Sequence, residues 1–217
     1  MDEMERYLRH TPVFDSDSEP IKRKAEELTR GKEEVADKAK NLFYFVRDEI
    51  KYNFYAPPSH LEFYQASRTL QAENGFCIQK SILLDALARA IGIPARLHLA
   101  DIRNHLLPEK IVALAGTNDI VFHGYSELYV EGKWVKVTPS FDLKMCQENR
   151  IIPSEFNGRS DAMLHSHNLE GKLHIEYTKD RGNYEELPFE EIRDTWFQVY
   201  GSDCFERWAE FSEMRGG

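Results

Sequence analysis

The chain has 217 residues, of which 41% are hydrophobic and 30% are charged, and this composition is typical of a globular protein with a sizeable core. Its 28 Lys and Arg residues stand against 37 Asp and Glu residues, which gives a formal net charge of −9. An acidic chain without a long basic run is a poor candidate for binding nucleic acids or anionic membrane surfaces.

The N-terminal sequence, the apolar runs and the cysteines indicate the expected cellular compartment. The N-terminal run Met1–Arg6 has no apolar region, and no apolar stretch approaches the ~18 residues of a membrane span, so we expect neither a secretory signal nor a membrane segment. The cysteines are Cys77, Cys146 and Cys204, which are widely spaced and odd in number. They suggest no disulfide framework and no zinc ribbon, and a reducing cytoplasm is the expected location.

Helix signals dominate the first half of the chain. After an extended lead-in over residues 11–20, the pattern predicts a charged helix over 21–30 and an amphipathic helix over 35–50. Residues 52–64 carry four aromatic side chains and two consecutive prolines, and we expect an irregular loop. The helix that begins at Cys77 has apolar side chains over most of its surface and ends at Gly92, which predicts a central, buried helix.

Strand signals follow, and the chain then returns to helix. Residues 131 and 132 are Glu-Gly, a two-residue hairpin turn between two strands. The predicted strands cover residues 96–100, 123–130, 133–137 and 173–178, and the predicted C-terminal helices cover 189–200 and a segment from about 202 that contains Phe205, Trp208 and Phe211. Helices, then an antiparallel sheet, then helices predict a single α+β domain over residues 1–217.

Cys77 directly follows Gly75-Phe76 at the predicted start of the central helix. The first amide N–H groups of a helix lack intrahelical partners, and the aligned peptide dipoles leave partial positive charge there. Both effects stabilise a thiolate, so we predict a nucleophilic cysteine whose pKa lies below about 8.5. Taken alone, Cys77 fits a buried cysteine that acts as a small hydrophobe equally well.

His123 begins a strand of the predicted hairpin and shares a face with Tyr125, Glu127 and Tyr129. Across a tight hairpin, the start of one strand lies opposite the end of the next. We therefore expect His123 to lie near residues 138–142, where it would act as the base that a cysteine nucleophile requires. The alternative for a single strand histidine is a satisfied residue of the core.

These segments together resemble the transglutaminase-like superfamily of papain-like cysteine enzymes. The resemblance extends over residues 35–145 and rests on pieces that occur in the family's order: Phe45–Tyr52, Gly75-Phe76-Cys77, Ala86–Arg96, His123, Gly132-Lys133-Trp134 and Thr138-Pro139. It implies a nucleophile helix packed on an antiparallel sheet, a Cys-His-Asp triad, and neither a metal nor an organic cofactor.

The third member of the triad is where the chain departs from the family. The family's acid stands directly before the corner proline, and here that residue is Thr138. Either Asp142, four residues later, or the Thr138 hydroxyl itself could orient His123, and we predict Asp142, although Asp142 fits a turn or cap residue equally well. The backbone N–H of Cys77 is a natural oxyanion donor, and Tyr52 is the candidate for the second.

The remaining polar candidates have ordinary explanations. His165, His167 and His174 have no carboxylate or cysteine at ligand spacing, so we expect no metal site. Cys146 and Cys204 are predicted to be structural. We expect Trp134 in the core, where it would buttress the hairpin.

The predicted reaction is attack of Cys77 on a carboxamide or peptide carbonyl of a peptide, a protein or a small amide, with His123 as base and then acid. The resulting thioester passes to water, which we expect as the default acceptor, or to an amine in acyl transfer. The alternative is a catalytically inactive peptide- or protein-binding module, because Thr138 occupies the position of the family's acid.

Overall fold

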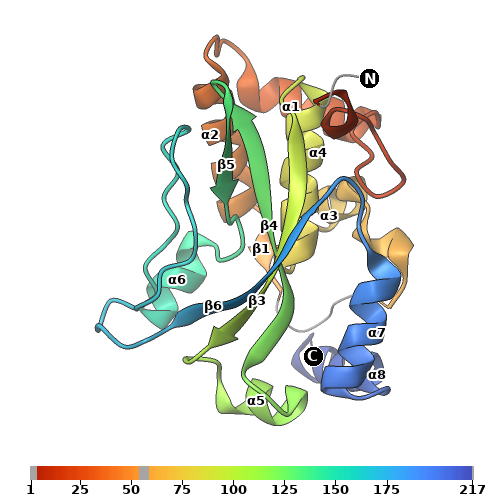
Figure 1. Ribbon diagram of the computed structural model, residues 1–217, viewed down its shortest axis with the longest axis vertical. Coiled ribbons are helices and arrows are strands. Elements are labelled where there is room, and N and C mark those ends of the chain that lie inside the picture. The colour runs from red at the N-terminus through yellow and green to blue at the C-terminus, as the bar shows by residue number, and fades with distance from the viewer. Residues whose placement is uncertain (1–3, 54–58, 217) are drawn as a thin grey trace.

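A computed structural model describes residues 4–53 and 59–216, with side chains as far as Phe211, and has α+β architecture (Figure 1). The helices are η1 Glu5–Tyr7, α1 Glu19–Thr29, α2 Val35–Asp48, η2 Leu61–Tyr64, α3 Ala66–Ala72, α4 Cys77–Ala90, α5 Glu109–Ala115, α6 Leu143–Asn149, α7 Phe189–Tyr200 and α8 Cys204–Gly216, where η marks 3-10 helix. The strands are β1 Lys51–Tyr52, β2 Asn74–Gly75, β3 Ala95–Asn104, β4 Asp119–Val130, β5 Lys133–Val137 and β6 Ile175–Tyr184.

The main sheet of the described residues has the strand order β5-β4-β3-β6, and every neighbouring pair is antiparallel. Glu131 and Gly132 join β4 to β5 with φ values of 50° and 86°, the positive-φ pair that suits a two-residue hairpin. The predicted hairpin is therefore confirmed. Its register pairs Ser126 with Val137, so the residues after β5 run alongside the beginning of β4.

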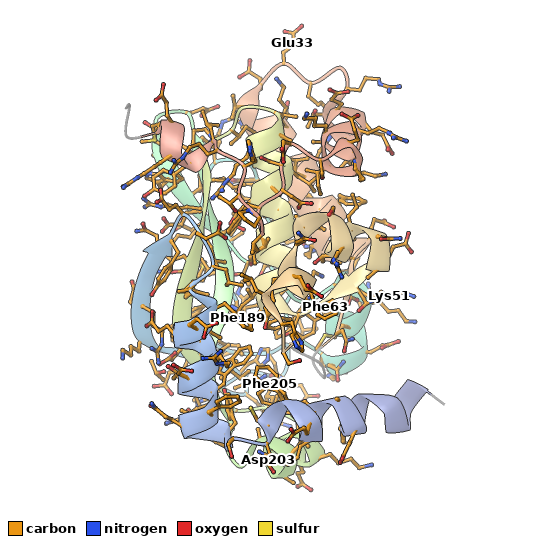
Figure 2. The ribbon with its side chains drawn as sticks, turned by 90° about the vertical axis from the view of Figure 1, so that its right-hand side faces the viewer. Glu33, Lys51, Phe63, Phe189, Asp203 and Phe205 are labelled. Carbon is orange, nitrogen blue, oxygen red and sulfur yellow. The ribbon has the colours of Figure 1, made fainter. Side chains whose placement is uncertain are left out.

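Helix α4 is the centre of the domain, as its apolar sequence predicted. It packs against β3 and β4 on one side, and α1, α2 and α3 cover its other side (Figure 2). Leu83, Leu87, Leu97 and Leu128 are fully buried in this main core. The helix is thus held on both sides, and its N-terminus has a fixed position relative to β4.

Several elements differ from the prediction. The seven-residue helices α3, α5 and α6 were not predicted, because they are too short for the helical period to show. Of the loop predicted over residues 52–64, residues 54–58 lie outside the described part of the chain. The core position predicted for Trp134 is wrong. Its ring is half-buried at the sheet edge, where the Arg96 guanidinium lies 4.0 Å from its centroid.

The C-terminal helices α7 and α8 form a corner below the sheet, next to α5. Asp203 lies on the turn between them and Phe205 at the inner side of the corner (Figure 2). Trp196 of α7 meets Trp208 of α8 edge to face at 5.7 Å. Among the described residues, none of the helices combines the length and the apolar character that crossing a membrane requires.

Candidate active site

The start of α4 is built so that Cys77 is its first residue. Strand β1 pairs in parallel with β2, with Tyr52 opposite Gly75, and this pairing delivers the chain to the helix. The Gln79 side chain accepts a hydrogen bond from the N–H of Phe76 at 3.2 Å, so the residue before the helix is capped. The predicted placement of Cys77 at a helix N-terminus is confirmed.

Four hydrogen-bond donors are directed at the Cys77 sulfur. They are the backbone N–H groups of Cys77, Ile78 and Gly124 and the side chain of Tyr52, and each favours the thiolate. Burial opposes them and is the largest effect, and it raises the pKa of Cys77 to about 11. The predicted lowering of this pKa is therefore wrong, because Cys77 is only 3% exposed and belongs to the main core.

Alkylation of Cys77 should reveal this raised pKa. Between pH 7 and 10 we expect the rate with iodoacetamide to rise about tenfold per pH unit, because the thiolate is the reacting species. Cys146 is a matched control in the same chain, since burial also raises its pKa to about 11 but its thiol donates to the Phe141 carbonyl, an acceptor that does not favour the thiolate. Peptide mapping by mass spectrometry should find Cys77 modified faster than Cys146. A rate that is flat across this range would instead indicate a preformed thiolate.

Gly124 brings β4 into direct contact with the start of α4. A Cβ atom at this position would lie 2.9 Å from Ile78 Cα and 3.2 Å from Ile78 N. Only glycine permits the backbones to approach this closely. The approach lets the Gly124 N–H point at the Cys77 sulfur, so the sulfur lies beside the peptide group that joins His123 to Gly124.

His123 is buried on the opposite side of β4 from the side-chain position of Gly124, since neighbouring strand residues alternate. Its ring meets Tyr177 edge to face at 6.2 Å. Burial lowers the pKa of His123 to about 3, so the imidazole is neutral at pH 7. Within residues 4–53 and 59–216, Nε2 of His123 has no hydrogen-bond partner, and no hydrogen bond joins His123 to Cys77.

The backbone is strained directly before His123. Phe122 has a φ of 59°, which is unfavourable for a bulky residue, and the facing strand β3 shows a bulge between Ala100 and Ile102. The Asp101 carboxylate accepts the Phe122 N–H at 3.0 Å and binds the Arg181 guanidinium at 2.6 and 2.9 Å. This ion pair holds the bend that sets the direction of His123, and no sequence signal predicted it.

No carboxylate takes the place of the family's acid among the described residues around His123. Thr138 forms a hydrogen bond with the Tyr177 hydroxyl and contacts the Met163 sulfur at 3.6 Å. Extending the register of β4 and β5 places Ser140 across from His123, and the fully buried Ser140 hydroxyl also has no partner within the described part of the chain. Tyr177 is therefore a neighbour of the site that the sequence analysis missed, whereas Ser140 falls within the segment 138–142 that it expected near His123.

Asp142 is close to the site but does not orient His123. One carboxylate oxygen caps α6 by accepting the N–H of Met145 at 2.8 Å, and the other accepts the N–H of Tyr52 at 3.1 Å. The two oxygens serve the helix cap and Tyr52, and Nε2 of His123 has no partner among the described residues, so this structure shows no Asp142–His123 hydrogen bond. Asp142 instead fixes the backbone of the residue whose side chain bonds the Cys77 sulfur.

Substitution of Asp142 should separate these roles. Asp142→Ala removes the cap and the Tyr52 contact, so we expect a loss of about 1 kcal/mol in unfolding free energy and a slower reaction at Cys77. Asp142→Asn keeps one acceptor oxygen, so it should retain the helix cap and lose the Tyr52 contact, because its NH2 group would then face the Tyr52 N–H. Chemical denaturation and the iodoacetamide rate are the measurements. An unchanged pH dependence of Cys77 alkylation is expected in both variants, whereas an altered one would return Asp142 to the role of His123 partner.

Two cavities meet at Tyr52. One of about 70 Å³ is lined by apolar side chains and by Cys77 itself, and a larger one of about 650 Å³ lies between α6 and the segment before α5. Tyr52, Leu107 and Ile111 line both cavities. In the part of the chain that the structure describes, no group of three or more His, Cys, Asp or Glu side chains is arranged to hold a metal ion.

Comparison with protein families decides the relationship. Residues 22–139, more than half of the chain, match the family described as the transglutaminase-like superfamily. The chain belongs to this superfamily. The helix that begins at Cys77 and the strand that bears His123 both lie within the matched segment, which confirms the resemblance found in the sequence. None of the curated proteins matches this transglutaminase-like chain.

Comparison with solved structures identifies the fold. A candidate cysteine protease from Cytophaga hutchinsonii superposes with a TM-score of 0.54 at 19% identity, over 86% of this chain and 48% of that one. A candidate protease from Parabacteroides distasonis (TM-score 0.40, 18% identity, 58% of this chain and 25% of that one) and the periplasmic domain of TgpA from Pseudomonas aeruginosa (0.39, 18%, 59% and 46%) are more distant. The chain spans about half the length of the first structure. The α+β fold is therefore transglutaminase-like and papain-like, as predicted.

Proposed function

We propose that the protein is a cysteine-nucleophile enzyme that cleaves carboxamide or peptide bonds through a thioester on Cys77. The observation that carries this proposal is the convergence of four donors on one sulfur next to a cavity. A buried cysteine that acts only as a small hydrophobe needs no such donors. Membership of the transglutaminase-like superfamily supports the same chemistry, and so does His123, which directly precedes the Gly124 N–H that points at the sulfur.

In this proposal Cys77 and His123 are both uncharged before the substrate reacts. With a pKa of about 11 for Cys77 and about 3 for His123, the proton stays on sulfur at pH 7. His123 therefore takes the proton as the sulfur attacks the carbonyl carbon, and the carbonyl becomes an oxyanion. The N–H groups at the start of α4 are donors for that oxyanion, and Tyr52 is the candidate side-chain donor.

Breakdown of the tetrahedral intermediate completes the cycle. The imidazolium of His123 gives its proton to the leaving amine, the carbon–nitrogen bond breaks, and the thioester remains on Cys77. Water then attacks the thioester with His123 again as base, which releases the acid and restores the thiol. Hydrolysis is the proposed default, since the large cavity beside Tyr52 leaves the site open to solvent-borne acceptors.

A specific observation favours a second candidate, a binding module without catalysis. His123 has no carboxylate partner among the described residues, and both pKa values oppose an ion pair. An imidazole with a pKa of about 3 is a weak base, so the proton transfer is strongly uphill. In this candidate Cys77 packs in the core and the cavities bind a peptide without reaction.

Acylation of Cys77 by p-nitrophenyl acetate distinguishes the two. For the enzyme we expect a burst of p-nitrophenol and an acetyl group on the peptide that contains Cys77, detected by mass spectrometry at short times. Added glycine methyl ester shows by its effect on turnover whether an amine competes with water. The absence of any Cys77 adduct in the folded protein would rule the enzyme out and leave the binding module.

Cys146→Ala is the matched control for Cys77→Ala. Both cysteines are buried and have similarly raised pKa values, but Cys146 belongs to α6 and lies in a separate hydrophobic cluster. We expect Cys77→Ala to abolish acylation and turnover and Cys146→Ala to retain them. Equal loss in both variants would show that the effect comes from the core and not from the nucleophile.

A further inference from the structure

The cavity of about 70 Å³ beside Cys77 is assembled from three parts of the chain. Leu107 and Ile111 approach from the region of α5, Phe76 precedes the nucleophile, and Trp196 and Trp208 come from α7 and α8. Helix α5 is far in sequence from the consecutive helices α7 and α8, and it contacts α8 at this corner. Cys77 lines the same cavity, so a group that enters it lies directly against the sulfur.

Three polar side chains of the cavity wall, those of Trp196, Tyr200 and Asp119, already have partners in the protein. Nε1 of Trp196 donates to the Val121 carbonyl at 3.1 Å, and the Tyr200 hydroxyl donates to the Asp119 carbonyl at 3.1 Å and accepts the Val121 N–H at 2.9 Å. The Asp119 carboxylate binds the Arg103 guanidinium at 2.7 and 3.2 Å. The wall therefore offers an occupant its apolar faces, and a polar occupant would lose its own hydrogen bonds.

Arg207 fixes the relative position of the walls. Its guanidinium donates to the carbonyl groups of Leu114 in α5 and Tyr200 in α7, and it forms an ion pair with Asp203 at 3.2 Å. The ring of Trp208 also packs against that of Tyr200 at 5.3 Å. A cavity held by a partly buried cation and by rings that meet edge to face is preformed, which is typical of a ligand site.

The size of the cavity limits the occupant. Since a water-sized group needs about 10–15 Å³, 70 Å³ admits about five such groups. We propose that this cavity is the specificity pocket of the Cys77 site and that it takes the aliphatic side chain of the acyl residue, of leucine size, whose carbonyl the sulfur attacks. This inference rests on the proposed function and adds the substrate class to it. The 650 Å³ cavity beyond Tyr52 is then on the side of the leaving group.

Two p-nitrophenyl esters test the preference. N-acetyl-leucine ester should acylate Cys77 at least tenfold faster than N-acetyl-glycine ester, because aliphatic burial discriminates by about one to two orders of magnitude. Ala115→Phe places a ring in the cavity and should bring this ratio close to one without slowing the glycine ester. Leu114→Ala enlarges the cavity and should shift the preference toward the N-acetyl-phenylalanine ester.

A binding measurement tests the proposed pocket independently of catalysis. In a Cys77→Ala and Trp134→Phe background, the only tryptophans are Trp196 and Trp208, and both line the cavity. We expect 4-methylpentanamide to change their fluorescence with saturation, acetamide not to do so, and Ala115→Phe to abolish the response.

The outcomes separate the inference from the proposed function. If the glycine ester acylates Cys77 and the leucine ester is no faster, the pocket assignment is wrong and the enzyme proposal stands. If neither ester acylates Cys77, the enzyme proposal fails, and the fluorescence titration then decides whether the cavity binds an aliphatic group at all. A missing response to 4-methylpentanamide together with equal ester rates would overturn the pocket.

Discussion

Replacing Gly124 with alanine is expected to cost about 2–3 kcal/mol of unfolding free energy and to slow acylation of Cys77 by about 100-fold or more. The added methyl group would lie 2.9 Å from Ile78 Cα, so β4 and the start of α4 must move apart. This separation withdraws the Gly124 N–H from the sulfur and moves His123 away with it. Chemical denaturation and the p-nitrophenyl acetate burst measure the two effects.

Two variants show whether the backbone contact is the cause. Ser126 lies on the same face of β4 and already has a Cβ atom toward α4, so Ser126→Ala should lose its hydrogen bond to the Ser81 carbonyl and keep acylation. Adding Ile78→Ala to Gly124→Ala removes the side-chain part of the clash but not the contacts with Ile78 Cα and N. Full recovery of acylation in the double variant would contradict the backbone explanation.

Replacing His123 with glutamine is expected to lower the rate of Cys77 acylation by about 10²–10⁴, the range of a general base. It should also make the unfolding free energy of the protein depend less on pH below 6.5. The pKa of the buried imidazole is about 3, against about 6.5 in the unfolded chain, so below pH 6.5 the unfolded state binds a proton that the folded state does not. Stability that is present above pH 6.5 is therefore lost as the pH falls toward 3, and the loss amounts to about 3 kcal/mol at pH 4.

The slope of unfolding free energy against pH between 6.5 and 3 is the measurement for His123→Gln, since it is independent of any constant packing cost of the glutamine. His98→Gln is the matched control. His98 is also buried, two positions from the residue that pairs with His123, but its ring nitrogens bond Glu127 and Asp180 and it has no contact with Cys77. Acylation should survive in His98→Gln. If the slope of unfolding free energy against pH between 6.5 and 3 is the same in His123→Gln as in the natural protein, the His123 imidazole is not buried in the neutral form.

Much of the fold could be predicted from short-range signals. The central helix begins at Cys77 and the hairpin turns at Glu131-Gly132, because caps, positive-φ turns and apolar periodicity depend on neighbours along the chain. The order of these pieces also revealed the superfamily. The short helices α3, α5 and α6 escaped prediction, since seven residues carry less than two periods of the helical pattern and tertiary packing decides their form.

Part of the candidate site could likewise be predicted from the sequence, and part could not. Sequence alone placed Cys77 at a helix start and His123 on the strand beside it, because residue type and local pattern identify both. It did not determine the pKa of the sulfur, which burial raises against the helix dipole and the four donors. Nor did it show that Asp142 holds Tyr52, that Gly124 allows the close approach of β4, or that α5, α7 and α8 enclose a pocket. Desolvation, hydrogen-bond partners and cavity walls arise between segments remote in the chain, so only the tertiary structure decided them.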